Sequence, residues 1–454
     1  MAGSTPSAAV AEDIAAGAGY PPQTYAWYVV SILCIGYIFA FIDRIVVGLL
    51  TTAIQKDLLL TDTQMGVLQG IAFALFYVLF GIPIGWLVDR WHRKTILTFG
   101  MTVWSLATAA CGYAGTFWTF FLCRVGVGIG EATLNPCSAS IIGDYFPPKQ
   151  RPKAFGIYVM GTAFGTGLTY LGGGVVFGFL AAYTVVDLGL FGELKPWRAM
   201  FLFVGLAGLL PALIFLLTVK EPARKDLAAK QKGNASWDEI KAFFKLNRRA
   251  IICHHIGISM VIMSIYAWVN WMAVYFDRIH QWGPAKFAIT YGVPGLITGI
   301  ISALSCGWLA TKLKERGTID GTMRAALIGC IGVVAGGVIA PQMPTPELAL
   351  AAFVVTGLFS NYPSVLALAA ISEITPNEMR GFLTSTYIFL VGLISSGVGP
   401  LLTGWVTDNV FGDQMRIADS LSLVTIITGS IGCATIAFGL KGYRESLARV
   451  TWGK

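Results

Sequence analysis

Charged residues are scarce in this sequence. Asp, Glu, Lys and Arg make up 12% of the chain, whereas a soluble globular protein carries about 25%. Hydrophobic residues make up 55%, and the mean hydropathy is +0.68. A helix needs roughly 20 apolar residues to cross the hydrocarbon core, and the chain offers twelve such windows. The sequence therefore predicts an all-α integral membrane protein with twelve transmembrane helices.

Several chemical signatures are also missing. The eight cysteines lie in or at the ends of the apolar windows, and no CxxC pair or Cys/His cluster occurs. We therefore expect neither disulfides nor a metal site. The chain has no GxxxxGK[ST] loop, no sizeable soluble domain and no nucleophile–base spacing. We expect no enzyme activity and no cofactor, with a proton gradient as the energy source.

Basic residues are distributed unevenly between the two sets of connections. The connections after every second window, together with the C-terminal tail, hold 24 of the 32 Lys and Arg residues, and the opposite connections hold 6. This bias places both termini in the cytoplasm, in a multi-pass protein of the inner or plasma membrane. The net charge of +8 thus reflects topology, and we expect no nucleic-acid partner.

The windows define the domain organisation. Residues 1–24 read as a disordered cytoplasmic tail without a signal peptide, 25–219 as a first six-helix bundle, 250–442 as a second bundle and 443–454 as a cytoplasmic tail. Residues 220–249 form a basic linker. Its apolar and basic residues favour either an amphipathic surface helix or a solvated segment, and the sequence leaves both open.

The two halves repeat each other. An acid, a proline and an arginine recur at the same spacing in Asp144-x-x-Pro147-x-x-x-Arg151 and in Glu373-x-x-Pro376-x-x-x-Arg380. Gly85-Trp-Leu-Val-Asp89 likewise aligns with residues 307–311, where Thr311 replaces the acid. Six-plus-six repeats around a basic central loop are typical of the major facilitator architecture.

Two motifs carry a family resemblance. The segment from Gly85 to Lys94, Gly-Trp-Leu-Val-Asp-Arg-Trp-His-Arg-Lys, resembles motif A of the major facilitator superfamily, and Arg124-x-Gly-x-Gly-x-Gly130 resembles motif B. Phe41-Ile-Asp-Arg44, Gly130-Glu-Ala and Trp197-Arg198 resemble the Spinster-like branch. That branch is associated with lysolipids and sphingoid phosphates, so the resemblance implies transport of a lipid-like amphiphile.

Motif A and its repeat suggest a gate at the cytoplasmic side. Arginines next to acids at helix ends can pair when that side closes and separate when it opens, which biases a two-state motion. Because of Thr311, we expect this gate to be asymmetric. The candidate gate residues are Gly85, Asp89, Arg90, Arg93, Asp144, Arg151, Glu373 and Arg380.

Four ionisable residues lie inside apolar windows of the first half: Asp43, Arg44, Arg124 and Glu131. A charge at bilayer depth costs at least a few kcal/mol, so such residues face a protein interior or a wet cavity. Arg124 and Glu131 are two helical turns apart and share a face, while Gly126 and Gly130 allow close approach of a neighbouring helix.

A buried carboxylate beside an arginine can exchange protons near neutral pH. We therefore predict Asp43 and Glu131 as proton-coupling residues, with Arg44 and Arg124 binding the substrate head group. A static salt-bridge network is the alternative, and the sequence does not decide which arginine pairs with which acid.

The second half buries no charge away from its helix ends and is rich in aromatic residues. A cavity between the halves would thus have one charged and one aromatic wall, which suits an amphiphile. Predicted contacts for the substrate tail are Trp268, Asn270, Trp271, Asn361, Tyr362 and Tyr387. His254 and His255 are expected at the membrane interface.

These observations predict a secondary transporter that works by alternating access, with proton coupling and an amphiphilic, lysolipid-type or sphingoid-type substrate. The expected partners are that substrate and membrane lipids, and we expect a functional monomer. The alternatives are an organic-anion or multidrug carrier of the same superfamily and a non-transporting lipid sensor.

Overall fold

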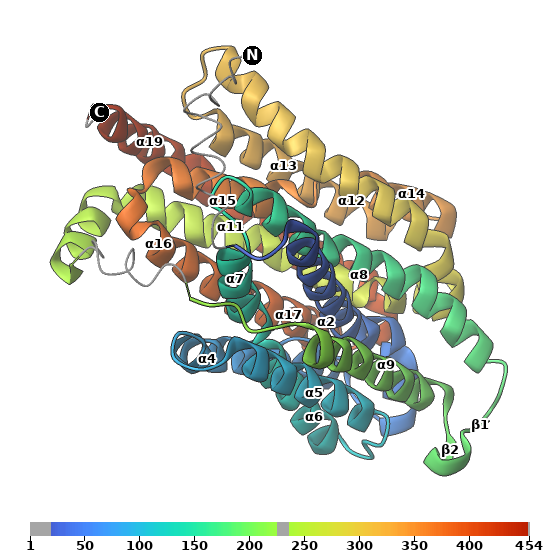
Figure 1. The fold of residues 1–454 in the computed structure, drawn as a ribbon. Coiled ribbons are helices and arrows are strands. Elements are labelled where there is room, and N and C mark those ends of the chain that lie inside the picture. The colour runs from blue at the N-terminus through green and yellow to red at the C-terminus, as the bar shows by residue number, and fades with distance from the viewer. Residues whose placement is uncertain (1–19, 225–235, 453–454) are drawn as a thin grey trace, which may run out of the picture.

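A computed structural model describes residues 20–224 and 236–452 of the chain (Figure 1). The described chain is almost entirely helical, and eleven spans are long and apolar enough to cross a membrane. The helix α5 (Arg93–Cys111) packs along α6 and α9 and completes a set of twelve. The predicted all-α fold with twelve membrane helices is therefore confirmed.

The first half contains six spans, two of which consist of two consecutive helices. They are α2 (Gln23–Leu58), α3 (Asp62–Gln69) with α4 (Ile71–Val88), α5, α6 (Phe117–Glu131) with α7 (Leu134–Tyr145), α8 (Arg151–Leu180) and α9 (Pro196–Thr218). A short hairpin of β1 (Val186–Asp187) and β2 (Glu193–Leu194) precedes α9.

The second half repeats this arrangement. Its spans are α11 (Trp237–His280), α12 (Pro284–Glu315), α13 (Gly321–Ile339) with η2 (Ala340–Gln342), α14 (Pro346–Gly357) with α15 (Tyr362–Ile374), α16 (Asn377–Leu390) with η3 (Val391–Val398), α17 (Gly399–Trp405) and η4 (Val406–Phe411), and η5 (Gln414–Arg416) with α18 (Ile417–Val424), η6 (Thr425–Gly429) and α19 (Ser430–Trp452). The fourth span is interrupted in both halves, between α6 and α7 and between α14 and α15.

The ends of the predicted domains differ from the structure in two places. Residues 237–249, expected within the linker, form the first turns of α11, because Ser236 caps the helix with a capping box that includes Glu239. Residues 443–452, expected as a tail, continue α19. The tail predicted for residues 1–19 lies outside the described residues.

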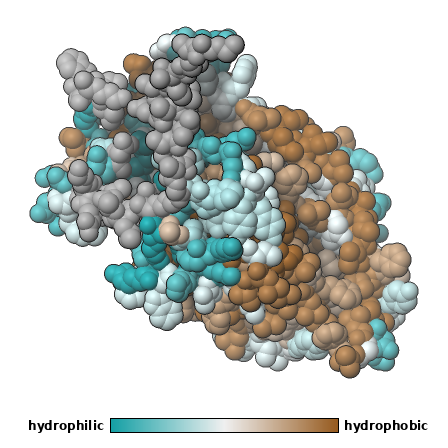
Figure 2. Space-filling view, viewed as in Figure 1, coloured by the Kyte–Doolittle hydropathy of each residue, from teal (hydrophilic) through white to brown (hydrophobic). Residues whose placement is uncertain are grey.

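The molecule has two opposite ends, which we call the terminal side and the far side. The terminal side carries residues 20–22, the α9 end near Thr218 and the α19 end. The far side carries the α2–α3 turn and the β1–β2 hairpin at the lower right of Figure 1. An apolar surface covers the body between them, whereas hydrophilic residues gather near the terminal side (Figure 2). This distribution is what a membrane-embedded body requires.

The halves touch mainly from the middle of the molecule to the far side. A Cβ added to Gly70 would lie 2.1 Å from the carbonyl oxygen of Gly397, so only glycine permits this backbone approach. The contact between α4 and η3 continues toward the terminal side as far as Val78, which lies against Gly392. Beyond it, a Cβ on Gly81 or Gly85 would meet no atom within 4 Å. The halves are therefore closed on the far side and separated on the terminal side.

Candidate functional site

A cavity of about 700 Å³ lies between the two halves. Residues of α2, α3, α4, α6 and α8 line it from the first half, and residues of α11, α12, α14, the α14–α15 connection, α15 and η3 line it from the second. Arg44 and Arg124 both face this cavity. Both predicted head-group residues thus reach the space between the halves.

Arg44 is held by a carboxylate and by three aromatic rings. Its Nε and Nη2 donate to Oε2 of Glu131, with N–O distances of 2.7 and 2.6 Å. Its guanidinium carbon lies 4.7 to 5.1 Å from the ring centroids of Phe41, Phe73 and Tyr77. The pairing that the sequence left open is therefore Arg44 with Glu131, between α2 and α6.

Arg124 has no carboxylate partner among the ion pairs of the described chain. Its Nε donates to the carbonyl oxygen of Leu68 and its Nη1 to the carbonyl oxygen of Asp43, both at 3.3 Å. Arg124 is 1% exposed, and long hydrogen bonds to neutral acceptors leave its guanidinium without a carboxylate partner where it lines the cavity.

The two predicted proton-coupling acids lie behind these arginines and do not line the cavity. Asp43 is 2% exposed and Glu131 is fully buried. Within the described residues, Oδ1 of Asp43 and Oε1 of Glu131 have no hydrogen-bond partner. A buried carboxylate oxygen without a hydrogen-bond partner is uncommon, and both acids have one.

The predicted contact of Gly130 with a neighbouring helix is confirmed. A Cβ there would lie 2.7 Å from the oxygen of Gly100 and from the nitrogen of Trp104, both on α5. This tight approach fixes α6 against α5 and thereby positions Glu131, the next residue.

The second-half wall contains some of the predicted tail contacts. Trp268, Asn270 and Asn361 line the cavity. Three other predicted residues face other partners and are not among the lining residues. Trp271 donates to the carbonyl oxygen of Pro400, the hydroxyl of Tyr362 bonds to Ser305, and the ring of Tyr387 packs against His254 and His255. Aromatic content alone did not separate cavity residues from packing residues.

The sequence analysis did not select several other lining residues. Gln69, Tyr170, Tyr291, Ser360 and Ser396 belong to this group. Serine and tyrosine are common in membrane helices, so only the helix rotation seen in the structure identifies them.

On the terminal side, the first-half gate residues form an intact network. Arg93 is 1% exposed, pairs with Asp144 and donates to Glu221 at 2.8 Å. Glu221 also accepts from the backbone nitrogen of Lys94 at 2.7 Å. The sequence analysis missed Glu221, which follows α9. The backbone at Asp89 is bound differently, by the guanidinium of Arg224.

The remaining gate residues are engaged within their own halves. Arg90 packs over the ring of Trp86, with its guanidinium carbon 4.1 Å from the ring centroid, and Arg151 donates to the carbonyl oxygen of Phe146 at 3.0 Å.

In the second half, Glu373 accepts hydrogen bonds from Lys314, Thr322 and Tyr443 at 2.6 to 2.8 Å. Arg380 donates to the carbonyl oxygen of Ser372 at 3.1 Å. Each of these contacts joins residues of the same half, as expected on a side where the two halves are apart.

A charged latch joins the halves on the far side. Arg278 of α11 donates to both carboxylate oxygens of Asp62 on α3, at 2.6 and 2.7 Å, and to Gln55 at 2.9 Å. Asp62 is fully buried. Nearby, the carboxylate of Asp408 accepts from the backbone nitrogen and the hydroxyl of Thr63 at 2.7 and 2.6 Å. The sequence analysis did not identify this latch.

Comparison with known proteins agrees with this arrangement. A family model described as the Major Facilitator Superfamily matches residues 33–400. The chain belongs to the major facilitator superfamily. A solved bacterial homologue of the human lysosomal transporter Spinster, in an inward-facing and unoccupied conformation, is 27% identical, covers 94% of this chain and 99% of its own, and superposes with a TM-score of 0.80. The resemblance to the Spinster-like branch is thus confirmed.

Two curated relatives show how broad this family is. An efflux pump of Mycolicibacterium smegmatis is 24% identical over 97% of both chains. A probable L-galactonate transporter of Escherichia coli is also 24% identical, over 87% of this chain and 84% of its own. The protein is therefore a secondary transporter of the membrane and not an enzyme, whereas relatives of equal identity differ in what they carry.

The two histidines of α11 are buried in the protein of this transporter. His254 and His255 are 1% and 3% exposed. Their Nδ1 atoms are 3.2 Å apart, and their Nε2 atoms lie 2.9 and 3.3 Å from the carbonyl oxygens of Ala367 and Leu383. Their expected place at the membrane interface stays a prediction.

Proposed function

We propose that this transporter moves an amphiphile with an anionic head group and an apolar tail, coupled to protons, by alternating access. The observation that carries the proposal is the asymmetry of the central cavity. Both of its arginines, Arg44 and Arg124, are on the first-half wall. The opposite wall carries Ile262, Ile265 and Trp268 of α11, which offer no charge.

The cavity also has an apolar flank along α8 and α12. Lining residues there include Val159, Met160, Phe164, Ile300 and Leu304, and each leaves between 42% and 71% of its surface exposed. An acyl or sphingoid tail can remain against such a surface while its head group reaches the arginines. This arrangement supports a substrate taken from the bilayer.

Proton coupling follows from competition for Arg44. A substrate anion that binds Arg44 weakens its bond to Glu131. The freed carboxylate is buried beside α5 and has no water shell, so it binds a proton to avoid an unpaired buried charge. Release of the substrate reverses the exchange. Asp43, whose Oδ1 lacks a partner in the described chain, supplies the second proton site.

We assign the terminal side to the cytoplasm, because the excess of Lys and Arg lies in the connections on that side. The molecule then faces inward, with its far-side latch closed. The transporter would reside in the inner or plasma membrane with both termini in the cytoplasm. We further propose that the monomer is the functional unit, because the cavity lies between two halves of one chain.

A second candidate is a carrier of small hydrophilic organic anions such as sugar acids. The relationship to the probable L-galactonate transporter favours it, and Asn270, Asn361, Ser360 and Gln69 in the cavity lining could bind hydroxyl groups. The amphiphile fits better because the flank along α8 and α12 is apolar.

A binding panel separates the two candidates. The purified transporter is titrated with lysophosphatidic acid, sphingosine phosphate, lysophosphatidylcholine, galactonate and glucarate, and binding is measured by calorimetry. We expect the anionic amphiphiles to bind and the sugar acids not to compete, with Arg124→Gln weakening the anionic amphiphiles by more than tenfold, as loss of a charge-assisted hydrogen bond requires. Binding of galactonate with no binding of any amphiphile would refute the proposed substrate class.

Arg316→Gln is the matched control for this panel. Arg316 is an exposed arginine at the terminal end of α12, outside the cavity lining and not among the candidate gate residues, and its loss changes the net charge equally. Its affinities should equal those of the parent.

A further inference from the structure

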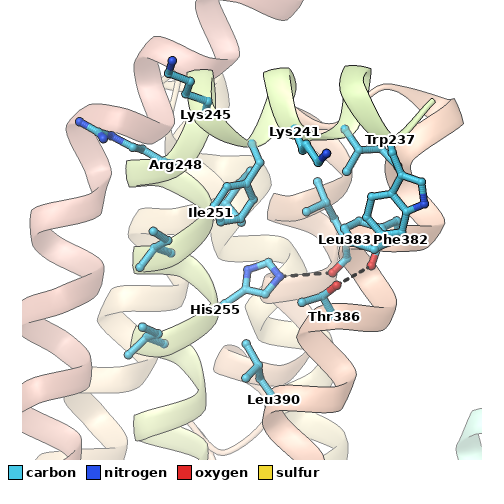
Figure 3. Close-up of a pocket in the computed structure, with 14 residues that line it drawn as sticks. Trp237, Lys241, Lys245, Arg248, Ile251, His255, Phe382, Leu383, Thr386 and Leu390 are labelled. Atoms are coloured by element: carbon cyan, nitrogen blue, oxygen red, sulfur yellow. Dashed lines mark hydrogen bonds between the residues drawn. The ribbon is translucent and has the colours of Figure 1, made fainter. Parts of the chain in front are cut away.

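A second cavity of about 600 Å³ lies outside the central one, between α11 and α16 on the terminal side. Figure 3 shows its lining side chains, which come only from residues 237–256 of α11 and 382–390 of α16. The two cavities have no lining residue in common. We call this second cavity the α11–α16 groove.

The inner part of the groove offers no free polar group. Two of its lining residues, His255 and Thr386, direct their polar atoms to carbonyl oxygens of α16, those of Leu383 and Phe382, at 3.3 and 2.9 Å (Figure 3). The other residues there are apolar. Ile252 and Ile256 leave 42% and 44% of their surface exposed. Exposed apolar side chains in a concave site favour an apolar ligand that covers them.

The rim of the outer part of the groove is cationic. Lys241, Lys245 and Arg248 line the groove through their aliphatic stems in the first turns of α11. Figure 3 shows Lys241 beside Trp237, whereas Lys245 and Arg248 lie on the opposite side of the view. Lys241 makes an exposed ion pair with Asp238 at 3.7 Å. In the described chain, no carboxylate pairs with Lys245 or Arg248. Two positive charges therefore remain available to an anion.

Along α11, the basic residues that line the groove come before most of its isoleucines. From Lys241 to Arg248 the groove is lined by three basic residues and Phe244, and from Ile251 to Ile256 by three isoleucines and His255, over about 22 Å of helix. Trp237 marks the outer end, where its exposed ring packs edge-on against Phe382 with ring centroids 5.7 Å apart. This sequence of head-group, interface and chain contacts matches the length and polarity of a phospholipid.

We propose that the α11–α16 groove binds an anionic phospholipid, with its phosphate at Lys245 and Arg248 and an acyl chain along Ile252 and Ile256. A soluble anion would leave the apolar part uncovered. A zwitterionic lipid would gain less from the basic part. The groove shares no lining residue with the transport cavity, so this proposal does not depend on which substrate the transporter carries.

The test measures binding of fluorescent phosphatidylglycerol and phosphatidylcholine to the delipidated full-length transporter in detergent. We expect the parent to prefer phosphatidylglycerol. The double variant Lys245→Gln with Arg248→Gln should weaken the binding of phosphatidylglycerol by about 30-fold. Each basic residue near an anionic lipid surface strengthens binding by about fivefold, and the variant removes two of them. The same variant should leave phosphatidylcholine unchanged. A variant Ile256→Trp, which fills the apolar part, should weaken both lipids.

Two controls make the result specific. Lys312→Gln with Arg316→Gln removes the same charge from the terminal end of α12, outside the groove, and should bind phosphatidylglycerol like the parent. Arg124→Gln, in the central cavity, should also leave it unchanged. Equal binding of the two lipids by the parent, equal loss in the α12 control, or full displacement by millimolar inorganic phosphate would overturn the proposal.

Discussion

Neutralising Asp62 should open the far side of the transporter. Arg278 donates to both oxygens of Asp62 and to Gln55, and only 9% of its side chain is exposed. Asp62→Asn leaves the guanidinium buried without its carboxylate in the closed far side, which costs about 3 to 5 kcal/mol. When the far side opens, Arg278 regains water and the cost disappears.

The magnitude is large enough to change which state is populated. A penalty of about 3 kcal/mol shifts a two-state equilibrium more than 100-fold. If the parent favours the closed far side by less than that amount, the open state becomes the majority in the variant. Removing the same carboxylate therefore converts a far-side-closed ensemble into a far-side-open one.

The assay is a distance distribution across the far side, measured by pulsed electron resonance. Spin labels introduced through a non-canonical amino acid at Leu59 and Met415 leave the native cysteines in place, and both positions are exposed at 87% and 54%. One label lies in each half. The Asp62→Asn variant should add a longer distance that is absent or minor in the parent.

Asp57→Asn is the matched control. Asp57 lies on the same side of the molecule and pairs with Lys195 and Arg198, but both partners belong to the first half. Its loss should leave the distance unchanged. The reasoning is refuted if Asp62→Asn gives the parent's distribution, or if Asp57→Asn opens the far side equally.

Three further predictions concern the first half. Glu131→Gln mimics a protonated acid that has lost its charge interaction with Arg44. In a pH titration of the far-side distance, this variant should lie closer than the parent to the acid distribution, and the remaining pH dependence should disappear when Asp43→Asn is added. Retention of the parent's full pH dependence in Glu131→Gln would exclude Glu131 as a coupling group. Asp89→Asn should lengthen the mean distance across the terminal side, measured between labels at 91 and 378, and no shift would remove this acid from the gate. Gly130→Ala should lower the free energy of unfolding by about 1 to 3 kcal/mol through overpacking against α5 and thus lower the melting temperature in detergent, whereas Gly143→Ala, whose Cβ would meet no atom within 4 Å, should not.

The sequence predicted the helices well because length and hydrophobicity are sufficient for that inference in a membrane. It also placed Arg44 and Arg124 between the halves, since a buried arginine has few other tolerable locations. Helix spacing fixes the face of one helix but not its rotation against another. For this reason only the structure could show that Arg44 pairs with Glu131. The same holds for the finding that Trp268 lines the cavity whereas Trp271 does not.

Long-range contacts were beyond sequence patterns. Asp62 and Arg278 lie at the ends of windows in different halves, and only the folded chain brings them together. One signal was present: basic residues are few in the connections on the far side, so each of them could have been examined for a nearby acid. The start of α11 at Trp237 also had a signal, the capping-box residues Ser236 and Glu239, which the sequence analysis did not use.

The most direct test of the account is transmembrane movement of a lysophospholipid in proteoliposomes. Fluorescent lysophosphatidic acid is placed outside, and its arrival in the inner leaflet or lumen is followed with and without a pH gradient. The account predicts saturable movement that a pH gradient accelerates and that the double variant Asp43→Asn with Glu131→Gln makes independent of the gradient. Binding without any movement above protein-free liposomes would contradict it and would leave a lipid sensor in place of a carrier.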